Sequence, residues 1–184
     1  MKKLLSIVAI TGLLATGAMA SNTKIGIYGG YGAGSYTVEN NDNTNNMHSY
    51  EGGIFIDNIN GHFYNGIQIG YAKYNYANGN VTPTAIMLRG KAGIHFGGKF
   101  PINIYGLLAG GYGSGDDEGY NYDYITFGGG IGVGVNFTKH WSIEINYLHT
   151  TDNFIYTDYP DEYNTYDAIQ RTTNRGEAFI KYSF

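Results

Sequence analysis

Apolar and polar residues alternate along much of this chain. The clearest example is segment 123–138, where bulky apolar side chains take every second position and glycine or small polar residues lie between them. A repeat of two residues is typical of a β-strand with two different faces. A sandwich core needs bulk inside, so we expect the bulky face to point toward lipid and the small face toward a narrow barrel interior. The bulky positions are Ile125, Phe127, Ile131, Val133, Val135 and Phe137.

Seven further segments show similar alternation, so the chain is expected to contain eight strands. Each one reaches the roughly 9–11 residues that a tilted strand needs to cross a bilayer. The first segment is rich in glycine, which leaves open which of its faces points outward. The expected strands are 24–38, 50–59, 62–74, 84–96, 102–112, 124–137, 141–150 and 172–184.

The connections between these strands alternate in length. Short turns are expected at 60–61, 97–101 and 138–140. Short turns on one side and long loops on the other are typical of outer-membrane barrels. An even number of strands then places both chain ends on the short-turn side, which would be the periplasm. The longer polar loops are expected at 39–49, 75–83, 113–123 and 151–171.

The inward positions carry charges of both signs, which argues against the alternative of a soluble lipocalin-like barrel with an apolar ligand cavity. Charges inside a narrow barrel must pair, because burying an unpaired charge is costly. Four acids balance four bases, which predicts a filled interior without a wide water channel. The expected network joins Glu51, Asp57, Glu144 and Glu177 to Arg89, Lys91, Arg175 and Lys181.

The first twenty residues have the pattern of a secretory signal peptide. Lys2 and Lys3 precede a short apolar run, and the run ends in the small-residue pattern at 18–20. The run is shorter than the ~20 residues of a membrane-spanning helix and contains two glycines, so cleavage after Ala20 is expected instead. The predicted organisation is a signal peptide at 1–20 and one barrel domain at 21–184.

Composition narrows the class further. The 184 residues include 29 Gly, 19 Tyr and no Cys, so an exported chain of this kind is not held together by disulfides. The formal net charge of −4, without a basic stripe, argues against a nucleic-acid partner. The mean hydropathy of −0.27 resembles that of a soluble protein, but strands that are apolar on one face only average to such values.

Few residues suggest catalysis. His140, Ser142 and Glu144 are spaced like parts of a hydrolase triad, but two of them point into the barrel and His140 lies in a turn. The five histidines show no metal-ligand spacing, and the acidic segment at 116–118 lacks the ligand pattern of a calcium loop. We therefore expect no catalytic residue, metal or cofactor, and no enzyme activity.

The segments GVGVNFTKHWSIEINY (132–147) and IKYSF (180–184) resemble the small eight-stranded outer-membrane barrels, the group of OmpX, the OmpA membrane domain and the opacity proteins. The resemblance covers the chain after residue 20. It implies an all-β fold, an eight-stranded antiparallel transmembrane up-and-down β-barrel, in the cell outer membrane of a Gram-negative bacterium. It also implies a signal for the barrel-assembly machinery at Ala178, Ile180, Tyr182 and Phe184.

The function predicted from these observations is structural and surface-interacting: membrane integrity, with adhesion through extracellular loops. The loop at 151–171 is acidic and rich in tyrosine, a side chain suited to binding surfaces. The alternatives are a small porin-like channel or transporter and, more weakly supported, a lipid A-modifying enzyme. The expected partners of a monomeric barrel are outer-membrane lipid, lipopolysaccharide, the barrel-assembly machinery and a host or environmental ligand at the loops.

Overall fold

A computed structural model describes residues 22–39, 44–77, 82–117, 120–156 and 170–184. The signal peptide predicted at 1–20 lies outside these residues, as do most of the tyrosines of the last predicted loop. None of the described residues belongs to a helix that is long and apolar enough to cross a membrane.

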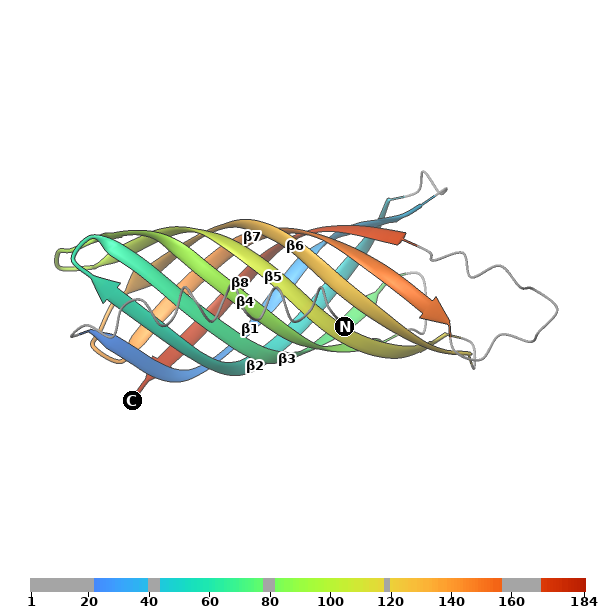
Figure 1. Ribbon diagram of the computed structural model, residues 1–184, viewed down its shortest axis with the longest axis horizontal. Helices are drawn as coiled ribbons and strands as arrows, with labels where there is room; N and C mark the ends of the chain where they lie inside the picture. The colour runs from blue at the N-terminus through green and yellow to red at the C-terminus, as the bar shows by residue number, and fades with distance from the viewer. Residues whose placement is uncertain (1–21, 40–43, 78–81, 118–119, 157–169) are drawn as a thin grey trace.

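Eight antiparallel strands form a closed barrel in which each strand pairs with its neighbours in the chain (Figure 1). The barrel closes between the first and last strands, where Tyr31 lies opposite Ala178. This confirms the predicted fold. The strands are β1 (Thr23–Val38), β2 (Thr44–Asn60), β3 (Phe63–Tyr76), β4 (Thr84–Phe96), β5 (Ile102–Asp117), β6 (Tyr120–Asn136), β7 (Trp141–Tyr156) and β8 (Gln170–Ser183).

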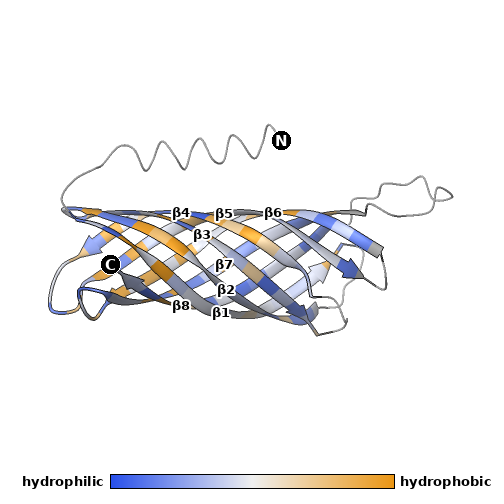
Figure 2. Ribbon diagram, turned by 90° about the horizontal axis from the view of Figure 1, so that it is seen from below, coloured by the Kyte–Doolittle hydropathy of each residue, from blue (hydrophilic) through white to orange (hydrophobic). Residues whose placement is uncertain are grey.

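The alternation along each strand separates an outer from an inner surface. Ile131 and Ile145 on neighbouring strands are 68% and 63% exposed, whereas Asn146, next to Ile145, is buried. On β1, whose facing the sequence left open, Tyr28 and Tyr36 point inward. Apolar segments lie over the middle of the barrel, and the strands become hydrophilic toward the end with the longer connections (Figure 2).

The two ends of the barrel differ. At the turn end, the short connections follow β2, β4 and β6, and Gly61 adopts a φ of 61° in the first of them, a conformation that favours glycine. Both the start of β1 and the end of β8 lie there, and the backbone N–H of Phe184 donates to the carbonyl of Ile25 at 3.0 Å. At the loop end, on the right in Figure 1, β1, β3, β5 and β7 finish.

The predicted strand boundaries are correct at both ends only for β4, at 84–96. Most of the error lies at the loop end, where the predicted loops 39–49, 113–123 and 151–171 contain long pieces of strand. Pairing between β5 and β6, for example, continues to Asp116 opposite Asn121. The predicted strands end where the lipid-facing alternation ends, whereas the hydrogen-bonded ladder continues beyond it.

Candidate functional site

The barrel interior is filled by charged, polar, aromatic and a few aliphatic side chains, and three clusters of them follow one another from the turn end to the loop end. Alternation places them: Arg89 and Lys91, for example, are two residues apart on β4 and both point inward. The turn-side cluster is Asp57, Lys91, Glu144 and Lys181, the central cluster is Glu51, Arg89, Arg175 and Glu177, and the loop-side cluster is Tyr36, Tyr76, Asp152, Phe154 and Arg171.

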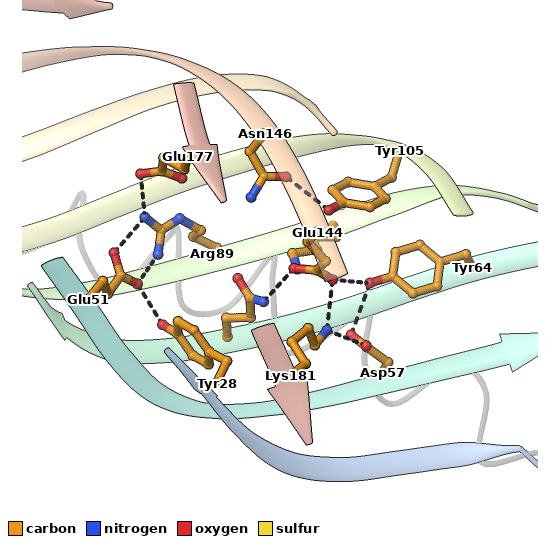
Figure 3. A network of polar contacts seen from close by, with 12 residues as sticks. Tyr28, Glu51, Asp57, Tyr64, Arg89, Tyr105, Glu144, Asn146, Glu177 and Lys181 are labelled. Carbon is orange, nitrogen blue, oxygen red and sulfur yellow. Dashed lines mark hydrogen bonds and ion pairs between the residues drawn. The ribbon is translucent and has the colours of Figure 1, made fainter. Parts of the chain in front are cut away.

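The turn-side cluster is built around Glu144 of β7 (Figure 3). Its carboxylate accepts hydrogen bonds from Lys91 Nζ at 2.5 Å and from Lys181 Nζ at 2.7 Å, each on a different strand. Gln68 Nε2 donates to the same carboxylate at 2.8 Å. Lys181 also forms an ion pair with Asp57. Two lysines and two acids from β2, β4, β7 and β8 therefore neutralise one another across the interior.

The central cluster is built around Arg89 of β4. Its guanidinium forms a bidentate pair with Glu51 and also donates to Glu177 Oε1 at 2.9 Å. Arg175 Nε donates to the same oxygen of Glu177 at 2.8 Å, and Tyr28 Oη donates to Glu51 at 2.6 Å. The Arg89 side chain has no solvent exposure. Charges buried this deeply persist only with such partners.

Inward glycines make room for this network. A Cβ at Gly132 would meet the Asn146 amide and the Tyr105 ring, whose hydroxyl donates to that amide at 2.9 Å. A Cβ at Gly70 would meet the Tyr28 hydroxyl and lie 3.0 Å from Glu51 Oε1. The small inner face predicted from the glycine pattern is therefore covered by long polar side chains from other strands.

Some buried polar atoms have no hydrogen-bond partner within the part of the chain that the structure describes. They include Gln68 Oε1, Arg175 Nη2 and Glu177 Oε2. Buried polar atoms of this kind typically bind ordered water. The interior is thus suited to individual waters held between the clusters.

The loop-side cluster is aromatic, with one ion pair at its centre. Arg171 of β8 donates from Nε and Nη2 to Asp152 Oδ2, at 3.0 and 2.9 Å. Its guanidinium carbon lies 4.0 Å from the centre of the Tyr76 ring and 4.5 Å from that of Phe154. The Tyr36 and Tyr76 rings meet edge to face at 4.8 Å. Cation–π contacts and ring packing thus close the interior below the loops.

The structure brings together all eight residues of the charge network predicted from the sequence, in the turn-side and central clusters. Sequence reasoning missed the loop-side cluster, because Tyr76, Asp152, Phe154 and Arg171 fell in predicted loops. The available signal was a second alternation, with aromatic residues inward and polar residues outward, as in Tyr74 and Tyr76 beside Lys73 and Asn75.

The residues predicted as the assembly signal lie on the outer surface of β8 and just after it. Tyr182 packs against Trp141, with ring centres 4.9 Å apart, and Phe184 against Tyr182 at 5.8 Å. Phe184 is 78% exposed and Ile180 55%. Ala178, two residues before Ile180, faces outward as well. These side chains form an apolar stripe that runs to the end of the chain.

The possible triad does not come together. His140 Nδ1 lies 2.8 Å from the carbonyl oxygen of Ser183, and Glu144 is occupied by the two lysines of the turn-side cluster. The described residues contain no group of three or more His, Cys, Asp or Glu that could hold a metal ion. Tyr159, Tyr163 and Tyr166 of the predicted binding loop lie outside the described residues.

Residues 6–172 match the family described as the outer membrane protein β-barrel domain. Among solved structures, the chain is similar to Neisserial surface protein A, with 10% identity and a TM-score of 0.50, over 87% of this chain and 99% of that one. Ail, the attachment invasion locus protein of Yersinia pestis, shares 13% identity with a TM-score of 0.47, over 89% and 100%. No curated protein sequence matches the chain. At 10% identity, the similarity to Neisserial surface protein A shows the fold alone.

Proposed function

The chain belongs to the outer-membrane protein β-barrel family, and on this premise we propose that it is a filled structural barrel that presents its longer connections at the cell surface. Its location is the outer membrane, where its outer surface contacts lipid. The finer role that we propose is to stabilise the membrane and to interact at the surface, without acting as a general pore.

The interior network is the observation that carries this proposal. Arg89 and Lys181 have no exposed surface, and the ion pair from Arg89 on β4 to Glu177 on β8 spans the barrel. An eight-stranded barrel has an interior just wide enough for side chains to fill. Paired charges in the middle and stacked rings at the loop end leave little room for a continuous column of water, which argues against the porin-like alternative.

Conductance across a planar bilayer tests this proposal. The purified barrel should show no steps comparable to those of a general porin measured in the same membrane. A variant that removes the central cluster, Glu51→Ala with Arg89→Ala, serves as the matched control, because it should open the interior and raise the conductance. Stable porin-sized steps from the unmodified protein would refute the filled-barrel function.

We propose that the loop end faces the cell exterior and the turn end faces the periplasm. The support is that β1, β3, β5 and β7 all finish at one end, so the longer connections gather there, as in outer-membrane barrels generally.

Surface adhesion would then involve the tyrosine-rich segment 157–169. Deleting that segment should lower cell adhesion without lowering barrel content in the membrane; unchanged adhesion would remove the binding role.

We propose that the stripe Ala178, Ile180, Tyr182 and Phe184 is read by the barrel-assembly machinery, after export directed by residues 1–20. The outward position of Phe184 supports this, since its side chain is open to a partner before the barrel closes. Phe184→Ala should reduce the folded protein recovered from outer membranes while leaving refolding in detergent unchanged. An equal loss in both would indicate a purely structural role.

We propose that the barrel is not an enzyme. The residues that most resembled a catalytic triad support this, because His140 and Glu144 each form their hydrogen bonds with other groups. Cells that express the protein should produce lipid A of unchanged mass. A new lipid A species that disappears in Ser142→Ala would restore the enzymatic alternative.

A further inference from the structure

Two histidines lie next to each other at the turn end of the barrel. His62 is the second residue of the tight turn between β2 and β3, and His95 is the second-last residue of β4. The backbone N–H of His95 donates to the carbonyl oxygen of His62 at 2.7 Å. Because Phe63 lies opposite Ile94, His62 stands directly across from His95. Residues in that relation have Cβ atoms about 4.5–5.5 Å apart on the same face of a sheet.

Both rings belong to the inward series of their strands, where the interior opens at the turn end. Tyr64 and Lys91, which share this inward series, are buried, whereas His62 is exposed and His95 is half-buried. The row continues into β5, where Asn103 lies opposite His95 and is buried. The pair is therefore fixed to paired strands on one side and open to solvent on the other.

One ring nitrogen of each histidine is held by a carbonyl oxygen. His62 Nδ1 lies 3.3 Å from the backbone carbonyl oxygen of His95, and His95 Nδ1 lies 2.7 Å from Oδ1 of Asn103. A carbonyl oxygen can only accept, so Nδ1 is the nitrogen that carries the proton in each neutral ring. Nε2 then keeps the lone pair with which imidazole binds a metal ion. Histidine ligands in metal sites are typically held in this way at their other nitrogen.

All five histidines of the chain lie in the described residues, and the other three have no histidine beside them. His48 and His149 lie opposite small or polar residues in the strand register. The ring of His140, in the turn between β6 and β7, stacks on Tyr182 instead. The adjacent pair is separated by 33 residues in the chain, so the spacing of histidines in the sequence did not reveal it.

We propose that His62 and His95 form a binding site for one divalent transition-metal ion of the kind of Zn²⁺ or Cu²⁺. Imidazole nitrogen suits these ions. The two Nε2 atoms contact the ion at about 2.0–2.1 Å, and Asn103 orients the His95 ring. No third His, Cys, Asp or Glu among the described residues joins the pair, so water completes the coordination and the ion remains exchangeable. That the site faces the periplasm rests on the proposed orientation of the barrel.

Calorimetric titration of the folded, untagged barrel in detergent with Zn²⁺ tests the site. One ion should bind per barrel, and His62→Ala and His95→Ala should each weaken binding by about tenfold or more. His140→Ala is the matched control, because this histidine also lies at the turn end with Nδ1 against a carbonyl oxygen but has no histidine beside it. It should bind Zn²⁺ like the unmodified barrel. An equal loss in all three variants, or no loss in the first two, would overturn the proposal.

A second set of measurements tests the geometry. Asn103→Ala removes the acceptor for His95 Nδ1 and should weaken Zn²⁺ binding by about tenfold, whereas Asn103→Asp keeps an acceptor and should retain it. Nitrogen NMR of the histidine rings should show Zn²⁺ shifting Nε2 of His62 and His95 but not of His140. Equal shifts in all three rings would refute the paired site. Binding in detergent does not depend on orientation, which surface labelling of the loops tests separately.

Discussion

The two ends of the barrel interior are closed by different chemistry. Toward the turn end, the turn-side and central clusters consist of ion pairs that join β2, β4, β7 and β8, with Glu144 and Arg89 as their centres. Toward the loop end, rings pack around one pair, Arg171 with Asp152. Both arrangements fill the same narrow interior. The stability of the ion-paired part depends on the balance of charges, and that of the aromatic part depends on the contact area between the rings.

The difference follows from what surrounds each part of the barrel. Where the strands face lipid, their bulky apolar residues are needed outside, so polar residues are left for the interior, as with Thr126 between Ile125 and Phe127. Beyond the lipid, the outer face can be polar and the bulky residues turn inward, as with Tyr122 and Tyr124 on the same strand. The alternation therefore inverts along a single strand where it leaves the membrane.

The largest effect should come from Glu144→Gln, which deprives Lys91 of its carboxylate partner and weakens the hold on Lys181. Removing one partner of a buried ion pair typically costs about 3–5 kcal/mol. Urea unfolding in detergent, followed by the shift of the folded band on an unheated gel, measures this loss. Asp123→Asn, an outward acid, is the control and should change little. An equal stability for both variants would show that the ion-paired clusters do not hold the barrel together.

A smaller effect should follow from Gly132→Ala in the same part of the interior. The new methyl group meets the hydrogen-bonded pair Asn146 and Tyr105, and overpacking of this kind costs about 1–3 kcal/mol. Gly106→Ala on the outer surface is the control, since nothing lies near its Cβ. The same urea titration separates the two. No difference between them would mean that the interior is less filled than described.

The smallest effect should come from removing the loop-side pair as a unit, with Arg171→Met and Asp152→Asn together. No buried charge is then left without a partner, so the loss is chiefly that of the cation–π contacts, about 1–2 kcal/mol. Hydrogen exchange should increase near Tyr76 and Phe154 and stay unchanged around Glu144. A loss as large as that of Glu144→Gln would contradict the division of the interior into ion-paired and aromatic parts.

The sequence predicted the ion-paired part well and the aromatic part poorly, for one physical reason. Charged residues at alternate positions of apolar strands, such as Arg89 and Lys91, must point into the interior, because the other face of the strand contacts lipid. Asp152 and Arg171 lie instead in segments whose outward residues are polar. Such segments were predicted as loops, because the prediction searched only for strands with an apolar outer face. Which acid meets which base could not be predicted either, because it depends on the stagger of the strands around the closed barrel.

The central claim is that, where the strands cross the membrane, their bulky apolar side chains point to lipid and their charged side chains point inward. Trp141, the only tryptophan in the chain, lies on the outer surface of β7 and is 43% exposed. With the barrel reconstituted in bilayers that contain brominated lipids, the fluorescence of Trp141 should be strongly quenched. Fluorescence that brominated lipids leave unchanged in the folded, reconstituted protein would contradict the claim.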